Sequence, residues 1–158
     1  MKEKPVLVED LNHLRCITLN RPQAMNAITP QMLSDLNTAL KEADDAKAVR
    51  IIVLTGAGRA FCSGLDLKQA SAGEGISGAF TGNKGASHYS TREICTVTLQ
   101  RMDTPVIAAI NGAAVGVGAT MTLPMDIRLA STKAKFGFVF AKRGIVPEAC
   151  SSWFLPRL

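Results

Sequence analysis

The sequence predicts an α/β domain, because short apolar runs typical of strands alternate with segments of helical periodicity. Leu14–Leu19 alternates in polarity and is rich in residues that favour strands, whereas residues 50–54 and 105–110 are nearly continuous apolar runs. We expect three strands here, the latter two buried on both faces.

Two helices are expected between these strands. Apolar residues recur at helical spacing from Met32 to Ala43, and Thr29 and Pro30 precede them as an N-cap and a first helical residue. A second helix is expected over residues 91–102, where apolar residues again recur before a proline ends the pattern.

The size and composition of the chain indicate one folded domain, residues 1–158. Of its 158 residues, 47% are hydrophobic and 20% are charged, which excludes global disorder. Residues 71–87 are rich in glycine and serine and are expected to form a mobile loop within the domain, with His88 exposed beside it. A helix-like apolar segment is barely begun after Pro147, so we expect the sequence to be truncated.

Charge and cysteine content exclude several classes of protein. The net charge of +5 comes from residues 80–158, but there is no basic run and only 5% of residues are aromatic, so no nucleic-acid partner is expected. Four widely spaced cysteines without a CxxC pair, and an N-terminus without a secretory signal, favour a reduced, cytoplasmic chain. The two histidines lack a neighbour at metal-ligand spacing, so no metal site is expected.

One uncharged segment, residues 104–125, is long enough to cross a bilayer. Its glycines, asparagine and proline instead favour a buried segment that contains turns, so no membrane partner is expected.

Two glycine-rich turns that follow apolar runs are the most informative feature of the chain. They cover residues 55–68 and 111–119. Glycine allows a backbone turn with positive φ and lets a ligand approach the amides closely, so the two turns could present two convergent N–H groups.

Two other interpretations compete with that of a ligand site. Gly56 and Gly58 form half of a dinucleotide-binding fingerprint, but Phe61 stands where the third glycine would be and no acidic residue follows at the required distance. The glycines could also serve only the tight turns themselves, and their spacing alone leaves that possibility open.

These motifs together resemble the enoyl-CoA hydratase/isomerase (crotonase) superfamily over nearly the whole chain. Residues 17–22 and 25–27 resemble its first strand and loop, residues 60–67 its first oxyanion turn, and residues 105–118 its second. The resemblance implies a crotonase-like spiral of ββα units that binds an acyl-CoA, with the thioester oxygen held by the backbone amides of Leu65 and Val117. Family members usually carry glycine at the position of Val117.

The resemblance also implies contacts with coenzyme A, which would enter as part of the substrate, and no separate cofactor is expected. The residues implied are Ala24, Ser63, Gly64, Leu65, Asp66 and Lys68. Lys68 would lie near the polar part of coenzyme A, although a lysine after a turn is often only solvated. Asp66 has a structural alternative, as the cap of a helix that starts there.

Family hydratases use two glutamates to add water, and here Thr120 and Phe140 stand at those positions. Neither side chain can transfer a proton as a carboxylate does. Glu148 has largely apolar neighbours, so burial would raise its pKa and suit it to acid/base chemistry. Pro147 and Glu148 could equally begin a helix, where the pKa would fall, and chemistry alone leaves both interpretations open.

Residues 147–152 resemble the segment of enoyl-CoA delta isomerases that carries their catalytic glutamate, which implies that Glu148 is the acid/base. We therefore expect double-bond isomerisation of an enoyl-CoA. The alternatives are an enoyl-CoA hydratase or acyl-CoA hydrolase in which Glu148 activates water, and a non-catalytic acyl-CoA-binding protein. A serine hydrolase is not expected, because Ser63, Ser151 and Ser152 have no histidine nearby in the sequence.

The resemblance further implies homotrimers or dimers of trimers, which family members form through C-terminal helices. The sequence apparently lacks this helical trimerisation segment, and the expectation of trimers refers to a full-length protein.

Overall fold

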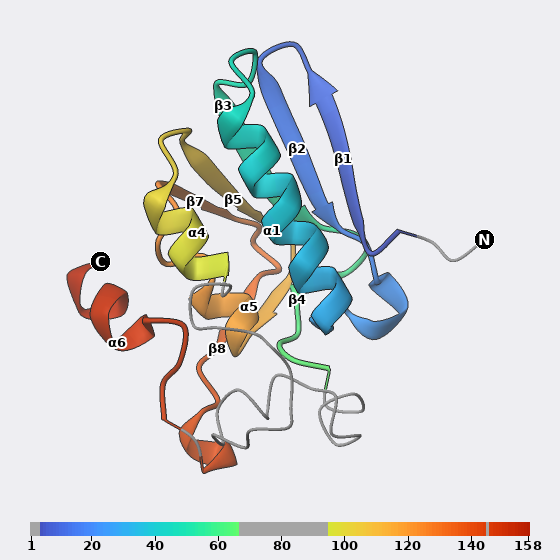
Figure 1. Cartoon of the computed structure of the whole chain (residues 1–158). Helices are drawn as coiled ribbons and strands as arrows, with labels where there is room; N and C mark the ends of the chain where they lie inside the picture. The colour runs from blue at the N-terminus through green and yellow to red at the C-terminus, as the bar shows by residue number, and fades with distance from the viewer. Residues whose placement is uncertain (1–3, 67–94, 145) are drawn as a thin grey trace, which may run out of the picture.

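A computed structural model describes residues 4–66, 95–144 and 146–158, which form two sheets and a set of helices (Figure 1). The larger sheet has the strand order β1-β2-β3-β5-β7, with β1 antiparallel to β2 and the other neighbours parallel. Its strands are β1 (Val6–Leu11), β2 (Leu14–Leu19), β3 (Ile51–Gly56), β5 (Val106–Ile110) and β7 (Ile127–Ala130). The smaller, parallel sheet consists of β4 (Ala60–Cys62), β6 (Ala113–Val115) and β8 (Lys135–Gly137).

The helical elements range from one turn to sixteen residues. The α-helices are α1 (Pro30–Asp45), α4 (Cys95–Arg101), α5 (Val117–Thr120) and α6 (Ser151–Phe154). The 3₁₀ helices are η1 (Pro22–Ala24), η3 (Ala141–Arg143) and η4 (Leu155–Arg157). Helices α1 and α4 pack against each other and cover one face of the larger sheet (Figure 1).

The connections between the two sheets repeat along the chain. Strand β3 leads into β4, β5 into β6, and β7 into β8, so that each turn of the chain adds one strand to each sheet. These connections cross closely: a Cβ on Gly112 would lie 2.1 Å from the carbonyl oxygen of Arg59. Glycine is therefore required at this crossing. The arrangement confirms the predicted spiral of ββα units.

The three predicted strands are confirmed as β2, β3 and β5, with bounds that differ by at most two residues. The expectation that β3 and β5 are buried on both faces is wrong for the described residues. Ile52 and Leu54 are fully buried under the helices, whereas Val53 and Thr55 on the opposite face are half-buried. Strand β1 and the four strands β4, β6, β7 and β8 were not predicted. Of these, β4, β6 and β8 have only three residues each, too few to show a periodicity.

Helix α1 begins as predicted. The Thr29 hydroxyl accepts a hydrogen bond from the amide of Met32 at 3.2 Å, and Pro30 is the first helical residue. Helix α4 lies within the predicted range 91–102, of which residues 91–94 are outside the described part of the chain. Lys68, the predicted loop 71–87 and His88 also lie outside the described residues.

The uncharged segment 104–125 forms β5, β6, α5 and the turns between them, as predicted for a buried segment with turns. Among the described residues, no helix has the length and apolar character that crossing a membrane requires.

Candidate active site

The two glycine turns follow neighbouring strands of the smaller sheet. Within the glycine-rich segments 55–68 and 111–119, residues 62–66 follow β4 and are here called the first turn, and residues 115–118 follow β6 and are called the second turn. Gly64 has φ +101° and Gly116 has φ +54°, both in the region that favours glycine. A Cβ on Gly64 would lie 3.0 Å from the Val115 carbonyl oxygen, and one on Gly116 would lie 4.0 Å from the Gly64 Cα. The two turns therefore lie side by side.

The residues after these glycines, Leu65 and Val117, present the amides predicted to bind an oxyanion. Within the described part of the chain, neither amide donates a hydrogen bond to another backbone group. Val117 is the first residue of α5, so its N–H has no partner inside that helix. Two unpaired donors on adjacent turns are an arrangement that could stabilise negative charge on a bound oxygen.

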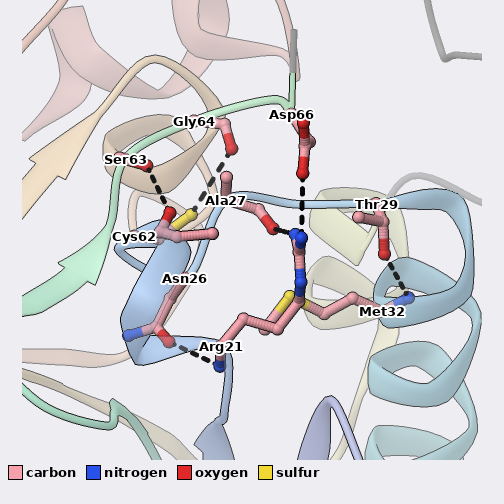
Figure 2. Close-up of polar contacts among 10 residues, drawn as sticks. Arg21, Asn26, Ala27, Thr29, Met32, Cys62, Ser63, Gly64 and Asp66 are labelled. Carbon is pink, nitrogen blue, oxygen red and sulfur yellow. Dashed lines mark hydrogen bonds and ion pairs between the residues drawn. The ribbon is translucent and has the colours of Figure 1, made fainter. Parts of the chain in front are cut away.

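The first turn is held by polar contacts from the loop that follows β2 (Figure 2). The Arg21 guanidinium donates to the Asp66 carboxylate at 2.9 Å and to the Ala27 carbonyl at 2.6 Å. Ile28 donates its amide to the Gly64 carbonyl at 2.8 Å and accepts from the Asp66 amide at 2.9 Å. The residues on either side of Leu65, Gly64 and Asp66, are therefore both hydrogen-bonded to Ile28, and this fixes the position of Leu65.

Ala24 and Ser63, both predicted to contact coenzyme A, are brought together by the same loop. The Ser63 amide donates to the Met25 carbonyl at 3.0 Å, and its hydroxyl donates to the Ala24 carbonyl at 3.4 Å. Asp66 is held by the ion pair with Arg21. The helix that it was predicted to cap would fall on residues outside the described part.

Asn26 is fully buried and locks this loop onto the connection between β3 and β4. Its side-chain oxygen accepts from the Arg21 amide at 2.8 Å, and its amide nitrogen donates to the carbonyls of Ala57 and Ala60 at 2.9 and 2.8 Å. Its backbone has φ +55°, a conformation that asparagine tolerates better than most residues. Sequence reasoning included Asn26 in the family motif without assigning it this role.

The second turn is held by close backbone packing. A Cβ on Gly118 would lie 2.2 Å from the Cys62 carbonyl oxygen, so only glycine lets α5 rest on the end of β4. The Gly116 amide donates to the Gly137 carbonyl at 2.8 Å. The positive φ falls on Gly116, whereas Val117 is helical, so a valine fits where family members usually carry glycine.

Glu148 meets Thr120, the residue that stands at the position of a family hydratase glutamate. The Thr120 hydroxyl, fully buried on α5, donates to Glu148 Oε1 at 2.8 Å. Burial raises the pKa of Glu148, and the hydrogen bond from Thr120 lowers it by less. Helix α6 begins at Ser151, so the alternative in which Pro147 and Glu148 open a helix is wrong.

Two thiols, Cys62 and Cys95, are buried in this part of the molecule. Burial raises the pKa of both Cys62 and Cys95 to about 12, and the charge of Glu148 contributes to the shift of Cys95. Both are therefore neutral thiols at pH 7 and not nucleophilic thiolates. All four cysteines of the chain are free.

A mostly apolar cavity of about 250 Å³ is lined partly by residues that precede and follow Glu148 in the sequence, and Glu148 itself is not part of its lining. Its lining residues are Phe138, Phe140, Ala141, Pro147, Ser151, Ser152, Leu155 and Pro156. Phe140, at the other family glutamate position, belongs to this lining and is buried. The part of the chain that the structure describes contains no group of three or more His, Cys, Asp or Glu residues that could hold a metal ion.

Known proteins resemble this chain in sequence and in fold. The model of the enoyl-CoA hydratase/isomerase family matches residues 9–158. The chain belongs to this family. Two solved structures of enoyl-CoA hydratases show the same fold. The enoyl-CoA hydratase/isomerase from Pseudoalteromonas atlantica has a TM-score of 0.83 and 30% identity, over 98% of this chain and 57% of that one. The enoyl-CoA hydratase from Mycobacterium smegmatis has a TM-score of 0.78 and 34% identity, over 98% of this chain and 59% of that one.

Relatives within the enoyl-CoA hydratase/isomerase family carry more than one activity in their names. An enoyl-CoA hydratase of Alternaria alternata is 44% identical over 94% of this chain and 48% of its own length. The 1,2-epoxyphenylacetyl-CoA isomerase of Escherichia coli is 36% identical over 90% of this chain and 53% of its own length. The chain thus spans about half the length of the curated relatives it matches. The names of these relatives include both hydratase and isomerase activities.

Sequence reasoning missed two polar pairs of this crotonase-type site. Arg21 was noted only as part of a motif, and Thr120 only as the residue that replaces a glutamate. The pairs Arg21 with Asp66 and Thr120 with Glu148 are 45 and 28 residues apart in sequence. One indication of these pairs was present in the sequence, namely that all four residues stand at positions of the family motifs.

Proposed function

We propose that this protein isomerises the double bond of an enoyl-CoA, with Glu148 as the acid/base and the amides of Leu65 and Val117 as the oxyanion donors. The observation that carries the proposal is the Thr120–Glu148 contact. Glu148 is a half-buried carboxylate with a raised pKa, and its neighbour Thr120 has a hydroxyl where family hydratases carry a glutamate. One carboxylate suffices to move a proton between two carbons, whereas hydration usually needs a second group to position water.

In the proposed reaction, Glu148 removes a proton from C2 of a 3-enoyl-CoA. The electron pair moves onto the thioester oxygen to form an enolate, and Glu148 returns the proton at C4 to leave the conjugated 2-enoyl-CoA. Removing one donor from such an oxyanion site typically costs about 10²- to 10³-fold in kcat. A carboxyl whose pKa lies closer to the working pH transfers the proton more efficiently in both directions. The reaction is a proton transfer and uses coenzyme A only as part of the substrate.

The substrate positions follow from the same proposal. The loop at Ala24, the first turn from Ser63 to Asp66, and Lys68 would contact coenzyme A. The hydrogen bond between Ser63 and Ala24 supports a joint surface for the first two of these. The apolar cavity lined by Phe138 and Phe140 suits the acyl group.

The test is an absorbance assay for conjugated 2-enoyl-CoA that starts from 3-enoyl-CoA. The parent protein and Glu148→Gln are compared, with coenzyme A binding to both measured by calorimetry. We expect conjugation by the parent, a loss of about 10²- to 10⁴-fold in the variant, and similar binding to both. Full activity in the variant would remove Glu148 from the mechanism.

A second candidate is hydration or thioester hydrolysis, with Glu148 activating water. It is favoured by the name of the Alternaria alternata relative, an enoyl-CoA hydratase. Reaction in ¹⁸O-labelled water separates the candidates, because hydration and hydrolysis place the label in the product and isomerisation does not. Binding of coenzyme A without turnover of any enoyl-CoA would instead favour a non-catalytic acyl-CoA-binding protein.

We further propose that the full-length protein forms homotrimers or dimers of trimers in the cytoplasm. Exposed apolar side chains near the C-terminus support an assembly, since Trp153 is 60% and Leu158 66% exposed. The four free cysteines are compatible with a reducing compartment. Light scattering after size-exclusion chromatography would report the molar mass, and a monomer at micromolar concentration would contradict the assembly.

A further inference from the structure

We propose that Thr120 is a positioning residue that couples the acid/base Glu148 to the oxyanion amide of Val117. The inference rests on the proposed function. It goes further by assigning a role to a residue that is neither a proton donor nor a ligand of the substrate in that mechanism.

The geometry of the Thr120 hydroxyl carries this inference. Its oxygen lies 2.8 Å from Glu148 Oε1 and 3.4 Å from the carbonyl oxygen of Gly116. That carbonyl belongs to the same peptide group as the amide of Val117. The hydroxyl has a single proton, so it can donate to only one of the two oxygens at a time.

The contact also determines which carboxylate oxygen is available for the reaction. Oε1 accepts the Thr120 hydroxyl, whereas within the described residues Oε2 accepts no hydrogen bond. In this proposal, Oε2 is the oxygen that exchanges a proton with the substrate. Thr120 keeps its own proton throughout and acts by holding the carboxylate.

The protonation of Glu148 shifts the preference of the hydroxyl. While Glu148 is ionised, the charged Oε1 is the stronger acceptor and holds the hydroxyl at the shorter distance. When Oε2 takes the substrate proton, the carboxyl becomes neutral and Oε1 becomes a weaker acceptor. The Gly116 carbonyl then competes better for the hydroxyl, and a hydrogen bond to that carbonyl polarises the Val117 N–H. The Val117 N–H would thus become a stronger hydrogen-bond donor at the stage of the reaction when the enolate oxygen is negatively charged.

The other titratable groups near Glu148 do not supply this stabilisation. Cys95 on α4 interacts electrostatically with Glu148, and Cys62 on β4 interacts with Cys95. Burial keeps both thiols neutral at pH 7, as their pKa values of about 12 require. Among the described residues, Thr120 is thus the side chain that stabilises the ionised form of Glu148 by a hydrogen bond.

The test compares Thr120→Val, which removes the hydroxyl at nearly constant volume, with Thr120→Ser, which retains it. Thr122→Val is the matched control, because the Thr122 hydroxyl donates to the Ala119 carbonyl at 2.8 Å on the same segment. The assay is isomerisation of 3-enoyl-CoA by the full chain as a function of pH. We expect Thr120→Val to lower kcat about 10- to 100-fold with KM within about threefold. Its acid limb should move to higher pH, because the group that lowers the pKa of Glu148 is gone.

Thr120→Ser should restore most of the rate and the position of the acid limb, and Thr122→Val should keep the parent profile. A Thr120→Val variant with the kcat and acid limb of the parent would overturn the proposal. So would equal losses in all three variants, because they would indicate general destabilisation. If Thr120→Val does not fold, as judged by circular dichroism, Thr120→Ala takes its place with the same expected outcomes.

A second readout does not depend on turnover. The carboxyl ¹³C resonance of Glu148, assigned by its loss in Glu148→Gln, reports the titration of this group directly. A higher titration midpoint in Thr120→Val than in the parent would support the positioning role even if no enoyl-CoA were isomerised, in which case the proposed function alone fails. An unchanged midpoint would overturn the positioning role.

Discussion

The first and second turns both follow a strand of the smaller sheet and both place a glycine of positive φ before the proposed oxyanion amide. They differ in how the amide is held. The first turn is held by side chains, chiefly the Arg21–Asp66 pair, whereas the second is held by the contact of Gly118 with the backbone of Cys62. The same local conformation is thus stabilised by polar contacts in one turn and by the absence of a side chain in the other.

The two solutions respond differently to substitution. A polar contact can be weakened in steps, because each hydrogen bond contributes about 1 kcal/mol. A backbone contact that a Cβ would violate at 2.2 Å cannot be relieved without moving a helix or a strand. Changes to the second turn should therefore cost more stability than changes to the first.

The largest effect is expected from Gly118→Ala. The added Cβ would force α5 away from β4, and we expect a loss of about 3 kcal/mol in the free energy of unfolding. Urea denaturation measures it. The control is Gly144→Ala, where φ is +66° but no atom lies within 4 Å of the added Cβ, with an expected cost of about 1 kcal/mol. Equal costs for the two variants would contradict the packing argument.

A smaller loss of stability but a clear loss of activity is expected from Gly64→Ala. Its φ of +101° disfavours an L-residue, and the Cβ would press on the Val115 carbonyl at 3.0 Å. We expect a loss of about 1–2 kcal/mol in stability and, by displacement of the Leu65 amide, about 10²-fold in kcat. Steady-state kinetics with 3-enoyl-CoA measures the latter.

Val117→Gly sharpens the same comparison, because it keeps the second amide and the positive φ of Gly116. Its kcat should stay within about threefold of the parent. A drop as large as that of Gly64→Ala would show that the side chain of Val117 is needed to aim its amide.

Arg21→Lys should weaken the first turn by the loss of about one hydrogen bond. Lysine keeps the charge but lacks the planar fork that reaches both Asp66 and the Ala27 carbonyl, so we expect a loss of about 1 kcal/mol in stability. The control is Arg15→Lys, because Arg15 forms an ion pair with the more exposed Asp10, so this change should alter stability by less than Arg21→Lys does. Thermal unfolding of both variants checks the difference, and equal shifts would remove the special role of the Arg21 pair.

The smallest effect concerns the pH dependence of stability. Burial raises the pKa of Glu148 in the folded state, so its contribution to stability is fully present below its unfolded pKa and is lost as the pH rises through the folded value. Glu148→Gln should therefore gain stability relative to the parent as the pH rises from about 4, near the unfolded pKa of a glutamate. Urea denaturation at several pH values measures this difference, and parallel curves for the two proteins would contradict it.

The elements that could be predicted from the sequence are those specified by interactions between residues close together in the chain. The cap at Thr29 and the spacing of Met32, Leu36 and Leu40 specify α1, and the apolar runs specify β2, β3 and β5. The strands β4, β6 and β8 could not be predicted from periodicity, since three residues do not complete a pattern. Their positions depend on the larger sheet, because its neighbouring parallel strands β3, β5 and β7 each lead at their carboxyl ends into one strand of the smaller sheet.

The two glycine turns could be found in the sequence from residue type and spacing, whereas the family and Glu148 as the candidate acid/base followed from the resemblance of its motifs to the crotonase superfamily. The hydrogen bonds from Thr120 to Glu148 and from Arg21 to Asp66 depend on tertiary packing and could not be found in the sequence. The structure also shows that Glu148 precedes a helix and does not open one. These contacts join residues far apart in the chain, and their distances are set by the packing of the two sheets and α5. No local propensity specifies such distances, because they exist only once the sheets have assembled.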